Sequence, residues 1–372
     1  MTEKIADLRV IDADGHVMEP DDLWVEYIDP AFRDRAPQRT VKTDRGWAQM
    51  IVDGEPMYRN YPDALVELFH ERTVAQYGDY LPFDPPSQLR ALEAQGVDIA
   101  FLYPSLGLGA AAIDHLDPKL AAAICRAYNN WLRDFCAADP HKLRPVALLS
   151  LHDVSLAIAE LRHAVNDLGM RAVILRPNMV NGRPVGHPDH ARFWAECAEL
   201  DVTVSFHEGC HTRLPAAGAD RFTSHFAMHA CCHPMEQMMA FISMVEGGVM
   251  ERHPGLRLGF LEAGCGWVPY LLWRLDDLEY RHWQFQIPEV KRPPSEYFAR
   301  QCWVTVEGCE PYLGKLADDI GTDRLLFASD YPHPDHEFGE ELEDVLKAPL
   351  SEDVKRRILW DNPSAFYRVE HA

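Results

Sequence analysis

The sequence predicts a (β/α)8 barrel. Short apolar segments recur along the chain, and most lack the apolar–polar alternation of a strand with one wet face. Such segments are typical of parallel strands that are covered on both sides. Amphipathic segments of helical period separate them, as expected for alternating strands and helices. The chain has 372 residues, 47% of them hydrophobic, which suits one barrel domain spanning residues 1–372.

Eight segments qualify as barrel strands because each is a short apolar run. In chain order they are Arg9–Asp14, Ile99–Tyr103, Pro145–Ser150, Ala172–Leu175, Thr203–His207, Arg257–Leu261, Trp303–Val306 and Leu325–Ala328. The intervening helices follow from a period near 3.6 residues. The segments with this period include Pro86–Gln95, Pro118–Ala137, Ser155–Leu168, Ala191–Leu200, Met235–Glu251, Trp267–Tyr280 and Ser351–Tyr367.

One connection is too long for a simple barrel. Residues 17–85 follow the first strand, so this insertion belongs to the C-terminal face, where barrel active sites lie. The insertion is rich in aromatic residues, among them Trp24, Trp47 and Phe69. We interpret it as a lid over the site. The alternative is a subdomain without a role in catalysis, or an oligomer contact.

Composition excludes several classes of partner. The formal net charge is -22, and such a surface repels nucleic acid and anionic lipid. The N-terminus lacks the apolar core of a signal peptide, and no apolar run reaches membrane-spanning length. We therefore expect a cytoplasmic protein with reduced cysteines. A homo-oligomer, or an assembly with a homologous chain, is also expected because the insertion is apolar.

The first strand ends in two acids and a histidine at alternate positions. Successive strand side chains point to opposite faces, so Asp12, Asp14 and His16 are predicted to share one face. Carboxylate and imidazole groups directed at one point suit a divalent cation. The alternative is that the acids cap the next helix.

Three later strands end in the same kind of side chain. His207 ends the fifth strand, Glu262 the sixth and Asp330 the eighth. The carboxyl ends of barrel strands meet at one rim, so these groups are expected to gather beside Asp14 and His16. The sequence therefore predicts a metal centre at this rim.

These motifs resemble the amidohydrolase superfamily. The resemblance rests on Asp14-x-His16, on His207, on residues 329–333 (Ser-Asp-Tyr-Pro-His) and on residues 359–366 (Leu-Trp-Asp-Asn-Pro-Ser-Ala-Phe). The most similar branch contains aminocarboxymuconate-semialdehyde decarboxylase and the resorcylate-type decarboxylases. The resemblance implies that Asp14, His16, His207 and Asp330 bind a divalent metal.

The sixth strand departs from the pattern of that branch. The decarboxylases place there an acid/base histidine followed by glycines, whereas this chain has Glu262. Clustered carboxylates repel one another unless cations neutralise them, and two metal ions would do so. One ion with Glu262 as a free general base is the alternative. We assign catalytic roles to Glu262, His207 and Asp330, and Asp12 is a further candidate ligand.

A row of histidines points to a second ion. His225, His229 and His233 stand four residues apart and share one face if the segment is helical. His229 or His233 would then complete a second metal site. The alternative is that His233 caps a helix before Pro234, while the others pack or face solvent.

A site of carboxylates and histidines with two ions suits iron or manganese. A few members that resemble this branch are dinuclear non-haem iron or iron/manganese monooxygenases. This resemblance predicts an O₂-dependent enzyme that uses an electron donor and hydroxylates a small carboxylic or aromatic acid. The alternative is a hydrolase or non-oxidative decarboxylase with one Zn²⁺ or Mn²⁺, in which Glu262 moves the proton. A third hypothesis is a catalytically silent barrel that acts as a partner subunit.

Two further residues are candidate substrate ligands. Arg176 follows the fourth strand and is able to hold a carboxylate through two hydrogen bonds. Its alternative role is a salt bridge to an acid of the site. His333 follows Asp330 and either contacts the substrate or orients a metal ligand.

Overall fold

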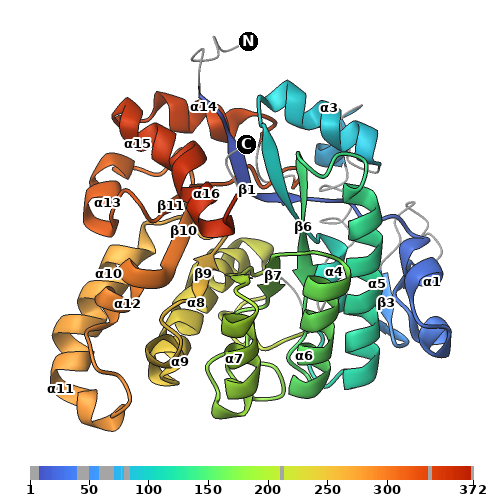
Figure 1. Ribbon diagram of the computed structural model, residues 1–372, viewed down its shortest axis with the longest axis horizontal. Helices are drawn as coiled ribbons and strands as arrows, with labels where there is room; N and C mark the ends of the chain where they lie inside the picture. The colour runs from blue at the N-terminus through green and yellow to red at the C-terminus, as the bar shows by residue number, and fades with distance from the viewer. Residues whose placement is uncertain are drawn as a thin grey trace.

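The computed structural model describes residues 8–39, 50–57, 71–76, 78, 84–209, 213–333 and 337–369. Eight parallel strands lie in chain order around a nearly closed barrel, and helices surround them (Figure 1). The strands are β1 (Ile11–His16), β5 (Ile99–Tyr103), β6 (Leu143–Leu148), β7 (Ala172–Leu175), β8 (Thr203–Phe206), β9 (Arg257–Phe260), β10 (Cys302–Val306) and β11 (Leu325–Phe327). The predicted (β/α)8 barrel is thus confirmed, and each predicted strand has its counterpart.

The strands are buried on both faces. Every residue of β5, β7, β8, β9, β10 and β11 is buried, because one side of each strand faces the barrel interior and the other faces a helix. This double coverage explains why their sequences are mostly apolar and lack a regular apolar–polar alternation.

Most of the helices follow the strands around the barrel. They are α3 (Pro85–Gln95), α4 (Leu106–Ala110), α5 (Pro118–Cys136), α6 (Val154–Arg162), α7 (Ala191–Glu199), α8 (His225–Glu246), α9 (Val249–Arg252), α10 (Trp267–Trp273), α11 (Arg281–Trp283), α12 (Pro294–Gln301), α13 (Leu313–Ile320), α14 (Glu340–Lys347), α15 (Glu352–Arg356) and α16 (Asn362–Tyr367). Wider or tighter turns join or extend some of them, namely η3 (His163–Asp167), η4 (Pro188–His190), η5 (Arg274–Tyr280), η6 (Gln284–Gln286) and η7 (Arg357–Asp361).

The prediction for the helix after β8 is wrong at its start. We expected Met235–Glu251, but α8 begins at His225 and continues through Pro234. The Ser224 side chain caps it by accepting a hydrogen bond from the Ala227 N–H at 3.3 Å. A proline indicates a helix start in a sequence, yet here packing of the flanking residues tolerates it in the interior. His233 therefore lies within the helix and caps nothing.

The insertion after β1 is described only in part. It contains α1 (Leu23–Tyr27), η1 (Pro30–Arg35) and a small antiparallel sheet of β2 (Gln38–Arg39), β3 (Met50–Val52) and β4 (Glu55–Pro56). Residues 40–49, 58–70, 77 and 79–83, with Trp47 and Phe69 among them, lie outside the described residues. The lid therefore stays a prediction.

The first and last strands meet at their carboxyl ends. The His16 N–H donates to the Tyr331 carbonyl at 2.7 Å, and the Asp330 N–H donates to the Asp14 carbonyl at 3.0 Å. These bonds bring the donors of β1 and β11 to one place. No helix of the described ranges has both the length and the apolar character that crossing a membrane requires.

Candidate metal centre

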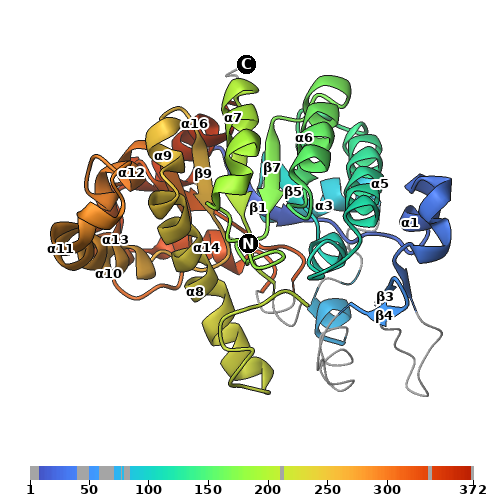
Figure 2. The same ribbon diagram turned by 90° about the horizontal axis from the view of Figure 1, so that it is seen from below.

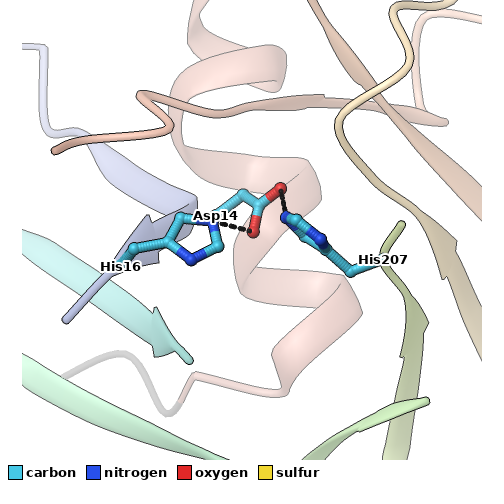
Figure 3. Close-up of side chains that lie close together, drawn as sticks. All are labelled: Asp14, His16 and His207. Atoms are coloured by element: carbon cyan, nitrogen blue, oxygen red, sulfur yellow. Dashed lines mark ion pairs between the residues drawn. The ribbon is translucent and has the colours of Figure 1, made fainter. Parts of the chain in front are cut away.

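Carboxylates and imidazoles converge where the barrel strands end. Asp14, His16 and His207 each offer a ligand atom within 4.8 Å of the others, and so do His207, Glu262 and Asp330. The Asp14 carboxylate lies between two imidazoles, 3.5 Å from His16 Nε2 and 3.5 Å from His207 Nε2 (Figure 3). His16 Nε2 is also 3.1 Å from Asp330 Oδ1. The predicted donors of four strands are thus brought together, and their chemistry fits a divalent metal.

Backbone carbonyls orient both histidines. His16 Nδ1 lies 3.1 Å from the Pro104 carbonyl, and His207 Nδ1 lies 2.6 Å from the Glu208 carbonyl. A carbonyl accepts only from N–H, so the proton is on Nδ1 and Nε2 presents its lone pair to the centre. Burial lowers the pKa of His16 to about 4 and holds the pKa of His207 well below its ordinary value. Both imidazoles are therefore neutral, the form that binds metals.

Glu262 and Asp330 occupy unusual backbone conformations. Their φ angles are 52° and 49°, in the left-handed region that costs a non-glycine residue free energy. The Glu262 N–H is held by Thr305 Oγ1 at 3.1 Å, and its carbonyl by His233 Nδ1 at 2.9 Å. The turn places the Glu262 Oε2 atom 3.0 Å from His207 Nε2. The strained backbone thus lies at the two residues whose carboxylates point into the centre.

Asp12 does not join the clustered donors. Its carboxylate accepts from the Ser329 hydroxyl at 2.5 Å and from the Ser329 N–H at 3.0 Å. The strand pairing shifts register between Asp12 and Gly15, and such a bulge changes the direction of side chains, so the alternation assumed for the sequence fails. Any Cβ at Gly15 would lie 2.7 Å from Asp12 Oδ2, which explains the glycine. Asp12 joins β1 to the end of β11.

His333 lies at the edge of the centre. Its Nδ1 atom is 2.7 Å from Asp330 Oδ1 and 4.0 Å from Glu262 Oε1, and its Nε2 atom is 3.1 Å from Ser105 Oγ. Its side chain is 21% exposed, more than those of Asp14, His16, His207 and Asp330. Together with His16 and Asp330, it forms a group of three possible metal ligands. Its position thus fits either role predicted for it.

The inner histidine of α8 approaches the centre from one side. His233 Nδ1 lies 3.6 Å from Glu262 Oε2, whereas His229 belongs to none of the donor groups found among the described residues. Arg176, the candidate substrate ligand, donates from Nη2 to Glu208 Oε1 at 2.8 Å and to the Gly209 carbonyl at 2.8 Å. Arg176 thus forms a salt bridge with Glu208, the residue after His207, and not with one of the acids predicted for the site.

A hydrogen-bond network that supports these residues was not predicted from the sequence. The Tyr103 hydroxyl is within hydrogen-bond distance of Ser205 Oγ at 2.8 Å and of the Tyr367 hydroxyl at 2.6 Å. The Tyr367 hydroxyl in turn donates to the Ala13 carbonyl at 2.7 Å. The carboxylate of Glu310 accepts from the N–H groups of Cys265 and Gly266, directly after the Glu262 turn. No local pattern indicates such contacts, because their partners are far apart in the chain.

Glu236 provides a pH-dependent test of this region. Burial raises its pKa to about 7, and its Oε1 atom accepts from the Ala217 N–H at 2.6 Å. The folded protein therefore binds this proton more tightly than the unfolded chain, so the free energy of unfolding falls as pH rises from about 4.5 to about 7. Glutamine does not titrate, so Glu236→Gln removes this fall. We expect the change that Glu236→Gln causes in the free energy of unfolding to be more stabilising at pH 8 than at pH 5, by roughly 3 kcal/mol at most. Urea unfolding at both pH values measures this difference. The exposed Glu199→Gln is the control, and an equal effect of Glu236→Gln at the two pH values contradicts the prediction.

Comparison with known protein families identifies the family of this chain. The model of the amidohydrolase family matches residues 11–369, nearly the whole chain. The chain belongs to the amidohydrolase family. The predicted resemblance is thus confirmed, and the relatives below put the chain in the branch that was expected.

Curated relatives have the names of decarboxylases. Gamma-resorcylate decarboxylase of Rhizobium radiobacter is 28% identical over 268 residues, which cover 66% of this chain and 76% of the relative. The enzyme of the same name from Rhodococcus jostii is 28% identical, over 71% of this chain and 83% of its own length. The 2-amino-3-carboxymuconate-6-semialdehyde decarboxylase of Dictyostelium discoideum is 26% identical, over 77% of each chain.

Solved structures share the fold. An amidohydrolase from Mycobacterium avium subsp. paratuberculosis superposes with a TM-score of 0.78 at 24% identity, over 98% of this chain and 99% of the other. A dihydroxybenzoic acid decarboxylase from Polaromonas sp., solved with manganese and the inhibitor 2-nitroresorcinol, gives a TM-score of 0.73 at 19% identity, over 98% of each chain.

These relatives overturn the predicted reaction. The expectation of an O₂-dependent monooxygenase is wrong, because the curated relatives named above are decarboxylases and not oxygenases. The expectations of iron, O₂ and an electron donor depended on that reaction and have no further support. The error came from Glu262: the change from histidine to carboxylate suggested a second ion, but a carboxylate is also able to carry a proton next to a single ion.

Proposed function

We propose that this protein is a metal-dependent decarboxylase of a small aromatic carboxylic acid. The observation that carries the proposal is the convergence of Asp14, His16, His207 and Asp330 at the barrel rim, in a chain that is similar to several proteins named as decarboxylases. The gamma-resorcylate decarboxylases and the manganese-bound Polaromonas structure support the choice of substrate class and of metal.

The four donors would hold one divalent ion, with manganese the first choice. When bound, the ion supplies positive charge that holds and polarises oxygen atoms of the substrate. The two neutral imidazoles and two carboxylates suit such an ion, and the backbone bonds of His16 and His207 keep their free nitrogens directed at it. Two ions, the initial expectation, would use Glu262 and a histidine of α8, His229 or His233, as additional ligands.

Glu262 would then donate the proton that replaces CO₂ on the ring carbon. Loss of CO₂ breaks a carbon–carbon bond and leaves its electron pair on the ring carbon, which must take up a proton. The Glu262 side chain lies beside His207 and is 11% exposed, so a carboxyl group meets the substrate where water is scarce. His333, 4.0 Å from Glu262 Oε1 and partly exposed, is placed to exchange that proton with solvent.

The reaction can be tested directly. Protein supplied with Mn²⁺ is incubated without O₂ with a set of hydroxybenzoic acids, 2,6-dihydroxybenzoate included, and CO₂ is measured. We expect CO₂ release and, in D₂O, one deuterium at the carbon that carried the carboxylate. Release that depends on O₂ contradicts the proposal, as does cleavage of amide or ester substrates without any decarboxylation.

A further inference from the structure

The histidines of α8 form a continuous row that the proposed reaction does not use. The centroids of the His225 and His229 rings are 5.0 Å apart, and those of His229 and His233 are 4.4 Å apart. Spacing by four residues on a helix puts the three rings on one face, as the sequence predicted.

The row leads from the barrel mouth to the metal centre. His225 and His229 are partly exposed, whereas His233 is buried. The end of α8 that carries His225 projects beyond the barrel (Figure 2), and it follows β8, so it lies on the face where the strands end. At the inner end His233 contacts Glu262, which also lies beside His207.

Two imidazoles four residues apart on one helix face are a common chelating pair for borderline cations such as Zn²⁺. A second observation at the inner end also points to a metal. His233 forms a buried group with Glu208 and Cys232 whose ligand atoms lie within 4.8 Å of one another. The net charge of -22 also attracts cations to the surface of the protein.

We propose that His225 and His229 bind a divalent transition-metal ion at the mouth of the barrel, and that this site feeds the centre through His233. The ion is held first by the outer pair. It then passes His233 and reaches the cluster of Glu262 and His207. The site depends on the row of imidazoles and not on the decarboxylase reaction.

The site is tested by titrating manganese-loaded protein with Zn²⁺ in a calorimeter, with the manganese content measured before and after. We expect the wild type to bind about one Zn²⁺ per chain without releasing manganese, and His225→Ala/His229→Ala to lose that ion. His141→Ala is the matched control, because His141 is exposed at the opposite end of the barrel, before β6. Circular dichroism checks that the variants are folded. Unchanged Zn²⁺ binding by the double variant overturns the site, and so does release of manganese equal to the zinc bound.

The feeding role has its own measurement. Metal-free protein is mixed rapidly with Zn²⁺, and occupation of the centre is followed with time. We expect the double variant to load several-fold more slowly than the wild type and the His141→Ala control, with the same final occupancy of the centre. Equal loading rates overturn the feeding role. Activity enters neither measurement, so failure here is distinct from failure of the decarboxylase proposal.

Discussion

Asp330→Asn is expected to remove the metal from the centre and to lower the rate of CO₂ release roughly a thousandfold or more. Asp330 offers ligand atoms to two of the donor groups, with His16 and His333 and with His207 and Glu262. A neutral amide is a much weaker ligand, and a bound ion is worth several kcal/mol of transition-state stabilisation. Asparagine tolerates the left-handed backbone of residue 330, so the turn itself is retained.

Elemental analysis and a CO₂ assay on the same preparations measure both effects. The control is Asp323→Asn, because Asp323 is exposed in the turn before β11 and belongs to none of the donor groups found in the described ranges. A variant at position 330 that keeps its metal and its rate shows that Asp330 is no ligand.

Glu262→Gln is expected to leave the metal in place and to lower kcat by about a hundred- to ten-thousandfold, the range for loss of a general acid or base. Glutamine keeps the size of the side chain, but it cannot carry a proton. Glu262→His places at the end of β9 the residue type that we associate with the decarboxylases. We expect it to restore part of the lost rate.

The metal content of these variants decides between the two roles of Glu262. If Glu262 is a ligand of a second ion, Glu262→Gln loses about one ion per chain along with its activity. If Glu262 carries the proton, the content is unchanged and deuterium incorporation from D₂O slows with kcat. A variant with full activity and full metal content excludes both roles.

The barrel and most of the donors were predictable because each depends on a local pattern. Apolar runs located the strands, and the rule that strand ends share one rim predicted that His207 and Glu262 lie together. The start of α8 was missed because Pro234 is a local signal for a boundary that packing overrides. Asp12 was misread because a bulge, which depends on pairing with β5, breaks the alternation of β1.

The reaction was less predictable than the site. The same carboxylates and imidazoles are able to hold one ion or two, and Glu262 is able to bind metal or carry a proton. Which of these roles a group takes depends on where the substrate lies relative to it. The types of the donor residues do not determine that position. The names of the relatives favour a decarboxylase over an oxygenase, and the Glu262 variants test the role of that residue.

The contact between Asp12 and Ser329 has a consequence for how the protein is made. These residues are separated by 317 positions, and the Asp14 and Asp330 carboxylates are about as distant along the chain. The chain must therefore be synthesised at least from β1 through the end of β11 before all four donors are present, and closure of so long a loop is slow. A nascent chain that ends before β11 lacks Asp330, so it cannot yet hold an ion with all four donors.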